Sequence, residues 1–201
     1  MAPSVEAIIK NYDFEVDDVQ RIAHRRVKPK IEIVEPDASW PQSFKLLKES
    51  IASALGSTAL EIEHVGSTSV PGLAAKPIID IDLTVQDPLD EAAYVPQLQA
   101  IGFDFLLREP SWHEHRFFCA YEPHTNLHVF GLDCPETVRH KIFRDWLRKT
   151  PADQELYVQA KREAAEAARK GNESMNDYSI RKNEVIRGIL DRAFRELGYI
   201  K

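Results

Sequence analysis

The chain has 201 residues, of which 43% are hydrophobic and 29% charged, and its formal net charge is −6. These proportions are typical of one packed soluble domain and exclude a disordered tail protein. No apolar run approaches the ~20 residues that a membrane helix needs, and the chain does not start with a signal-peptide pattern. Its cysteines are too few for a disulfide framework. We therefore expect a cytoplasmic protein that does not bind membranes.

The pattern of apolar residues predicts an N-terminal appendage followed by a single domain. The appendage covers residues 1–29 and carries helical patterns at 5–12 and 17–24. Within this domain the predicted strands come first and a run of predicted helices follows, an order that indicates an α+β fold. The sheet core is expected in 30–136 and a helical tail in 137–201. Strands are expected at 31–34, 60–65, 78–85, 103–107, 116–121 and 127–132, and helices at 41–55, 90–102, 137–149, 152–170 and 175–197.

Charge is distributed unevenly along the chain. From Thr137 onward there are 15 Lys and Arg residues against 10 Asp and Glu residues, whereas the preceding part is acidic. An acidic front and a basic back suit a site that joins a carboxylate-held metal to a polyanion. The alternative is that basic residues simply solvate the outer faces of the C-terminal helices.

Two acidic residues alternate along the most strand-like run of the chain. Residues i and i+2 of a strand point to the same face, so Asp80 and Asp82 project together. Paired carboxylates repel each other unless a cation lies between them, and Mg²⁺ prefers such oxygen ligands. The pair predicts a magnesium site, and the alternative is a half-exposed strand with its acidic side in water.

A loop of small residues precedes the acidic strand. Gly66 allows backbone N–H groups to approach an anion closely, and the hydroxyl groups of Ser67 and Thr68 add donors. The order of strand, Gly-Ser loop and acidic strand predicts an anion-binding loop beside the carboxylates.

Histidines offer a general base. His128 follows Asn126 on the same face of a predicted strand, and its ordinary pKa lies near neutrality. A hydrogen-bonded structural histidine is the alternative. His113, His115 and His124 lack a regular ligand spacing, so a solvated loop is favoured over a zinc site there.

Two Tyr–Lys pairs in the predicted C-terminal helices have the i, i+4 spacing that places both side chains on one helix face. The pairs are Tyr157 with Lys161 and Tyr178 with Lys182. A lysine can bind a phosphate chain as a point charge, and an arginine can bind one bidentately. We therefore expect both lysines and Arg144 to contact such a chain. Arg148 is expected to be exposed to solvent.

Several segments together resemble the GrpB (UPF0157) family. The long run at 63–80, the pattern Trp40-Pro41-x-x-Phe44, the segment 143–148 and the pattern Tyr178-x-x-x-Lys182 carry the resemblance, which spans roughly residues 31–195. The resemblance implies a nucleotidyltransferase-like mixed sheet core with a C-terminal helical region. It also implies that the Gly-Ser loop handles a triphosphate and that the Asp-x-Asp motif binds a divalent metal. Active nucleotidyltransferases usually add a third carboxylate from a later strand, where this chain has Asn126 and His128.

The resemblance suggests three functions. The first is a tRNA-dependent, arginine-containing cyclodipeptide synthase, as in some fungal proteins that resemble GrpB, which joins arginine from arginyl-tRNA to a second amino acid or aminoacyl group. Asp80 and Asp82 would receive the guanidinium, Ser67 the acyl group, and His128 would act as base. The second is Mg²⁺-dependent nucleotidyl transfer from ATP, and the third is a non-catalytic ligand-binding module, as in GrpB-like domains fused to a coenzyme A biosynthetic kinase. The predicted catalytic residues are Asp80, Asp82, Ser67 and His128, the substrate-binding residues are Gly66, Ser67, Thr68, Lys76, Arg116, Arg144, Lys161, Tyr178 and Lys182, and the metal ligands are Asp80 and Asp82.

Overall fold

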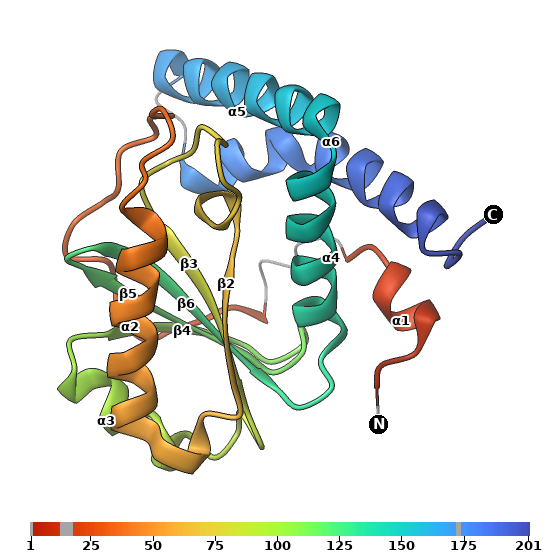
Figure 1. The fold of residues 1–201 in the computed structure, drawn as a ribbon. Coiled ribbons are helices and arrows are strands. Elements are labelled where there is room, and N and C mark those ends of the chain that lie inside the picture. The colour runs from red at the N-terminus through yellow and green to blue at the C-terminus, as the bar shows by residue number, and fades with distance from the viewer. Residues whose placement is uncertain (1, 13–17, 172–173) are drawn as a thin grey trace.

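The computed structural model describes residues 2–12, 18–171 and 174–201 and confirms the α+β fold (Figure 1). One six-stranded sheet has the order β1-β4-β5-β6-β3-β2. Only β3 and β6 run parallel among these neighbours, and the other pairs are antiparallel. The strands are β1 (Gln20–Arg21), β2 (Glu61–Val65), β3 (Ile79–Val85), β4 (Asp104–Glu109), β5 (His115–Tyr121) and β6 (His124–Gly131).

Helices cover both faces and one end of this sheet. Helix α2 (Trp40–Leu55) and the short α3 (Val95–Ala100) lie on one face, and α4 (Pro135–Lys149) lies on the other. Helices α5 (Pro151–Gly171) and α6 (Met175–Glu196) cross above the end of the sheet where β3 begins (Figure 1). Two short 3₁₀ turns, Gly56–Thr58 and Ser67–Ser69, flank β2.

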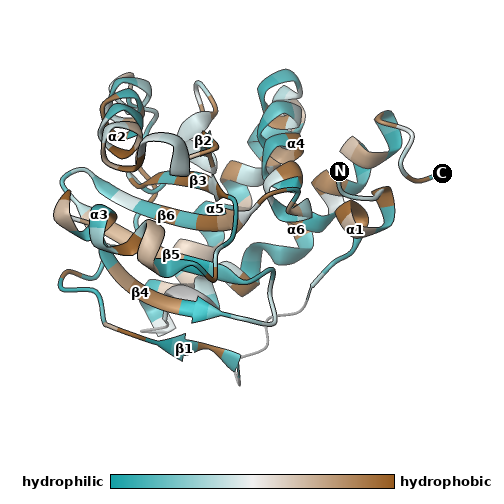
Figure 2. Ribbon diagram, turned by 90° about the horizontal axis from the view of Figure 1, so that it is seen from below, coloured by the Kyte–Doolittle hydropathy of each residue, from teal (hydrophilic) through white to brown (hydrophobic). Residues whose placement is uncertain are grey.

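The alternation of β3 determines what each face of the sheet contains. Ile79, Ile81 and Leu83 are at most 2% exposed and pack in the main core with α2 and α3. Asp80 and Asp82 therefore point to the opposite face, the side of α4. Figure 2 shows a second contrast, between strands: β4 and β5 carry hydrophobic segments, whereas the edge strand β1 is mostly hydrophilic.

Two elements predicted after residue 30 differ in the structure. Residues 31–34 do not form a strand of the sheet, because only Val34 pairs, in a single bridge with Ala75. The helix expected at 90–102 is limited to a 3₁₀ turn, Glu91–Ala93, and to α3, which begins with a proline in its first turn. Proline lacks the N–H that would continue one helix through this position.

The described residues before 30 contact the domain at several points, among them α1 (Val5–Ile9) and β1. Ile8 of α1 packs against Leu190 and Phe194 of α6, and Arg139 of α4 donates to the Ile8 carbonyl at 2.6 Å. Farther on, β1 pairs with β4 at the edge of the sheet. The helical pattern expected at 17–24 begins outside the described residues, and its described part holds β1 instead.

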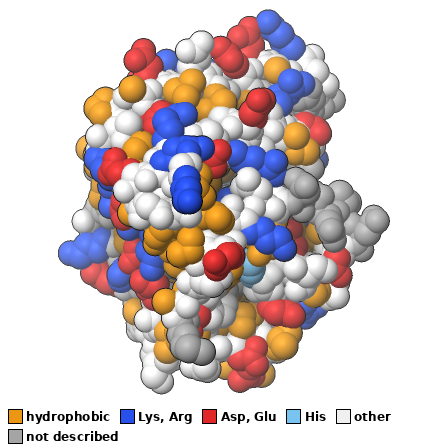
Figure 3. Space-filling view, turned by 90° about the vertical axis from the view of Figure 1, so that its right-hand side faces the viewer, with side chains coloured by type: hydrophobic (Ala, Val, Ile, Leu, Met, Phe, Trp, Pro, Cys, Tyr) orange, Lys and Arg blue, Asp and Glu red, His pale blue; other side chains and the backbone are white. Residues whose placement is uncertain are grey.

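The surface mixes charges of both signs. On the face in Figure 3, Lys and Arg side chains are interspersed with Asp, Glu and hydrophobic side chains. The excess of basic residues after Thr137 therefore does not form one continuous basic patch on this face. None of the helices in the described part of the chain combines the length and the apolar character that a bilayer crossing requires.

Candidate functional site

A cavity of about 200 Å³ lies where β3 begins, beneath α5 and α6. Its charged lining consists of three lysines and one aspartate. The segments that meet there are far apart in the sequence, which shows that the sheet and the helical tail build the site together. The lining residues are Gly66, Ser67, Lys76, Ile78, Asp80, Asn126, Tyr157, Lys161, Tyr178, Ser179 and Lys182.

The loop after β2 brings Gly66 against Asp80. Gly66 has a φ of 67°, which favours glycine, and a Cβ on it would lie 2.9 Å from the Cγ of Asp80. Ser69 Oγ donates to the Gly66 carbonyl at 2.6 Å and closes the turn. Only glycine at this position leaves room for the Asp80 carboxyl group and for the cavity beside it.

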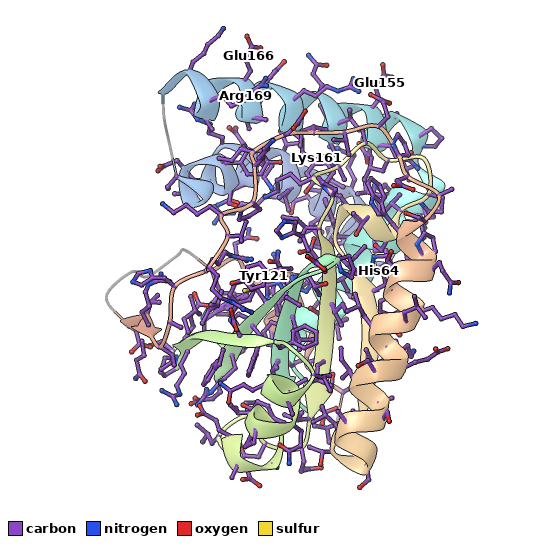
Figure 4. The ribbon with its side chains drawn as sticks, turned by 90° about the vertical axis from the view of Figure 1, so that its left-hand side faces the viewer. His64, Tyr121, Glu155, Lys161, Glu166 and Arg169 are labelled. Carbon is purple, nitrogen blue, oxygen red and sulfur yellow. The ribbon has the colours of Figure 1, made fainter. Side chains whose placement is uncertain are left out.

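Each Tyr–Lys pair shares one helix face, as the i, i+4 spacing predicts, and all four side chains line the cavity. The ammonium nitrogen of Lys161 lies 4.5 Å from the Tyr157 ring centroid, and that of Lys182 lies 4.5 Å from the Tyr178 ring centroid. Figure 4 shows Lys161 on the side of α5 that faces the sheet, whereas Glu155 and Glu166 point away from it.

Local sequence explains why α6 presents its pair here. Ser174 and Asp177 form a reciprocal capping box that begins α6 and places Tyr178 and Lys182 in its first two turns. The ammonium nitrogen of Lys76, from the segment that leads into β3, also lies 4.5 Å from the Tyr178 ring centroid. Tyr178 is 1% exposed, so its ring is a fixed surface against which two ammonium groups pack.

The three lysines supply the positive charge of the cavity, and their burial makes these amines easier to deprotonate. Burial, with smaller contributions from the charges of Lys182 and Lys76, lowers the pKa of Lys161 to about 7. Burial also lowers the pKa of Lys76 to about 8 and that of Lys182 to about 8. An anion in the cavity would stabilise the charged amines, raise these pKa values and draw protons onto the lysines.

Asp80 is the acidic group of the cavity. Its Oδ1 accepts a hydrogen bond from Asn126 Nδ2 at 2.7 Å, across the parallel pairing of β3 and β6. Burial raises the pKa of Asp80, although the Asn126 hydrogen bond and the charges of Lys76 and Lys182 oppose that rise. A carboxyl group with a raised pKa in a cavity is suited to accept a proton during a reaction.

Asp82 lies on the same face but outside the cavity. It is 3% exposed, and its Oδ2 pairs with Nδ1 of His140 on α4 at 2.8 Å. Burial lowers the pKa of His140, but the charge and the hydrogen bond of Asp82 raise this pKa by more than burial lowers it. The pKa of His140 is therefore about 9. The other oxygen, Oδ1, is buried and has no hydrogen-bond partner among the described residues.

His128 is hydrogen-bonded within the sheet and does not line the cavity. Its Nδ1 lies 3.0 Å from His115 Nε2, and His115 Nδ1 lies 2.6 Å from Glu109 Oε2. Burial lowers the pKa of both His128 and His115 to about 3, so both rings are neutral near pH 7. The geometry favours the structural alternative for His128 over the predicted role of a base.

Three predicted substrate-binding residues have partners within the fold instead. Thr68 is buried and donates to a backbone carbonyl at 3.0 Å. Arg116 and Arg144 are each paired with a glutamate, at 2.9 Å and 2.7 Å. Arg148, which was expected to be exposed, has a side chain that is 42% exposed and donates to the Ser69 carbonyl at 2.8 Å. These residues shape the loop and the sheet edge rather than the cavity.

The donor set at the cavity does not fit the expected magnesium site. Asp80 contributes one carboxyl group among three lysines, and Asp82 is already paired with His140. Across residues 2–12, 18–171 and 174–201, no three His, Cys, Asp or Glu side chains are grouped so that they could hold a metal ion. Mg²⁺ needs oxygen ligands, and ammonium groups repel it.

Four residues that line the cavity are not among the predicted site residues: Ile78, Asn126, Tyr157 and Ser179. Tyr157 precedes Lys161 by four residues and Ser179 precedes Lys182 by three, so helix-face spacing was the available signal for both. Asn126 was considered only as a replacement for a third carboxylate. Its contact with Asp80 depends on the parallel register of β3 and β6, which no local pattern specifies.

Comparisons with known proteins agree on one family. The sequence model described as GrpB protein matches residues 30–192. The UPF0157 protein of Halalkalibacterium halodurans is 41% identical over 180 residues, which cover 88% of this chain and 91% of that protein. The UPF0157 protein of Pseudomonas aeruginosa is 38% identical, with 82% of this chain and 68% of that protein covered. A dephospho-CoA kinase of Mycolicibacterium paratuberculosis is 31% identical over 69% of this chain, but the match covers only 40% of the kinase.

A solved structure shows the same fold. The crystal structure of the conserved protein GrpB from Enterococcus faecalis superposes with a TM-score of 0.68 and 25% sequence identity. The match covers 83% of this chain and 99% of that one. Because the family model and the bacterial relatives match most of the sequence, the chain belongs to the GrpB family.

Proposed function

We propose that this protein is a transferase whose cavity binds the phosphate chain of a nucleotide, with ATP as the first candidate. The observation that carries the proposal is the convergence of Lys76, Lys161 and Lys182 on one cavity that holds a single carboxyl group. Ammonium groups in a partly dehydrated site neutralise phosphate oxygens strongly.

The size of the cavity supports a phosphate chain rather than a whole nucleotide. Sites that enclose a drug-sized ligand measure about 300–1,000 Å³, and this cavity measures about 200 Å³. The phosphates would lie between the lysines, and the nucleoside would lie at the mouth. Ser67, whose side chain contacts the Tyr157 phenol, would add a hydroxyl donor.

Asp80 would act as the base in the transfer step. An acceptor hydroxyl would lose its proton to Asp80 while its oxygen forms a bond to the α-phosphorus. The bond between the α-phosphorus and the bridging oxygen would break, and pyrophosphate would leave. The lysines would neutralise the charge that develops on the leaving group.

The geometry gives less support to the arginyl-tRNA hypothesis. A guanidinium group near Asp80 would meet three lysines, and like charges at such a distance repel each other. Ser67, the acyl acceptor in that hypothesis, lies in the cavity, but His128, its predicted base, does not.

A ligand-binding module without transfer activity is the second candidate. The partial match to a dephospho-CoA kinase favours it, because the similar segment there is one part of a longer protein. Such a module would bind the phosphate chain in the same cavity and release no pyrophosphate.

Calorimetric titration with inorganic triphosphate and with ATP, in the presence of a chelator, tests the proposed function. We expect binding to one site, and Lys161→Met should weaken it by about 10-fold to 100-fold, because a hydrogen bond to a charged group is worth about 1.5–3 kcal/mol. The matched control is Lys170→Met, an exposed lysine on the same helix. Equal affinities for the two variants, or a wild-type protein that does not bind, would refute the proposal. Release of pyrophosphate from ATP then separates the transferase from the binding module.

A further inference from the structure

The segment that precedes the matched family region reaches the edge of the cavity. The family model matches residues 30–192, and Arg25 lies before that range. Its Nη2 donates to Asn126 Oδ1 at 2.6 Å, and Asn126 Nδ2 donates in turn to Asp80 Oδ1 at 2.7 Å. A continuous chain of hydrogen bonds therefore joins Arg25 to the carboxyl group of the cavity.

The contact with Arg25 determines how the Asn126 amide is oriented. A primary amide has one accepting oxygen and one donating nitrogen. Because the guanidinium can only donate, it holds the Oδ1 end of Asn126 and leaves the Nδ2 end directed at Asp80. Without Arg25, the amide keeps only its contact with Asp80 and loses one of the two partners that favour this orientation.

The backbone on both sides of Arg25 is attached to the sheet. Ile22 N and Ala23 N both donate to the Leu106 carbonyl, at 2.8 Å and 3.1 Å. On the other side, Arg26 N donates to the Tyr121 hydroxyl at 2.8 Å. The guanidinium carbon of Arg25 lies 5.3 Å from the centroid of the Phe117 ring, a cation–π contact on β5.

We propose that Arg25 is a positioning residue of the cavity, which acts through Asn126 to orient Asp80 and adds a fourth positive charge at the cavity edge. The proposal deepens the proposed function, because an oriented carboxyl group and a further cation both favour a phosphate-bearing ligand with an acceptor group. The GrpB cavity of this chain is therefore completed by a segment outside the matched region.

The first test observes Asn126 directly and does not depend on any ligand. The side-chain amide signals of ¹⁵N-labelled protein are assigned to Asn126 by their loss in Asn126→Ala. In Arg25→Met we expect these signals to shift and their hydrogen exchange to become about tenfold faster, which corresponds to the loss of a hydrogen bond of about 1.4 kcal/mol. Lys28→Met is the matched control, because it removes one exposed positive charge from the same segment.

Arg25→Lys should restore part of the Asn126 protection, since lysine also donates to an amide oxygen. If Arg25→Met does not fold, as judged by its thermal unfolding, Arg25→Gln replaces it. Asn126 signals that are unchanged in the Arg25 variant, or equally changed in Lys28→Met, would overturn the proposal.

The second test measures the affinity for inorganic triphosphate. Arg25→Met should weaken it by about fivefold, which corresponds to about 1 kcal/mol, and Lys28→Met should leave it within about twofold. If wild-type protein does not bind triphosphate, the proposed function fails, but the Asn126 signals still decide whether Arg25 positions the Asn126–Asp80 pair. An affinity loss of equal size in both variants would show a general charge effect and would contradict the positioning role.

Discussion

Asp80 and Asp82 point to the same face of the same strand, yet their surroundings are opposite. Asp80 opens into a cavity that three lysines line. Asp82, the next residue of β3 on the same face, is covered by α4 and paired with His140. The comparison shows that the position of a residue on a strand determines which face its side chain points to. The helix packed over that face then determines whether a carboxyl group lines a cavity or makes a structural contact.

The largest expected difference between the two aspartates concerns stability. Asp82→Ala removes the carboxylate that accepts from His140, which keeps only Glu136 at 3.5 Å, and a donor left unpaired in this way costs about 1–3 kcal/mol. Asp80→Asn removes a carboxyl group whose burial is unfavourable, so the free energy of unfolding should change by less than about 1 kcal/mol. Urea unfolding of both variants measures the difference, and equal losses would contradict it.

The second difference concerns ligand binding as pH changes. The pKa values of the cavity lysines are about 7 and about 8 in the free protein, so these amines lose charge between pH 7 and pH 9. Affinity for triphosphate should fall by at least about tenfold over this interval, since the charged fraction of each amine falls by up to a factor of ten per pH unit above its pKa. Calorimetry at pH 8 in buffers with different ionisation enthalpies should show proton uptake on binding. Release of protons, or an affinity that does not change with pH, would show that the lysines do not hold the ligand.

The smallest expected effect is on the stability of the ligand-free protein. The folded-state pKa of Lys161 is below its ordinary value, so the unfolded chain binds more protons between about pH 7 and pH 10. The free energy of unfolding should therefore gain a positive contribution from this lysine as pH rises from 7 to 9. Denaturant unfolding of wild-type protein and of Lys161→Met at both pH values measures it, and the variant should show the smaller rise. An equal rise in both proteins would assign the effect to other groups.

Local patterns were sufficient to predict much of the cavity. The alternation of β3 gave the common direction of Asp80 and Asp82, and the i, i+4 spacing gave the shared helix faces of the two Tyr–Lys pairs. The loop at Gly66 was recognised because small residues after a strand leave room for close contacts. Each of these features depends on residues that are neighbours along one element.

Features that depend on distant contacts could not be predicted in this way. His140 lies in the middle of a helix, and nothing near it in the sequence indicates a partner on β3. Arg25 belongs to a segment interpreted as an appendage, and its contact with Asn126 spans more than half of the described chain. The prediction that Asp80 and Asp82 hold one metal ion assumed that both carboxyl groups open into the same cavity. The packing of α4 over Asp82 separates them.

A crystal structure of the protein with inorganic triphosphate tests the central claim most directly. We predict that the triphosphate lies among Lys76, Lys161 and Lys182, with its oxygens within hydrogen-bond distance of at least two of the three amines. A triphosphate bound only elsewhere on the surface, with the cavity free of it, would contradict the account.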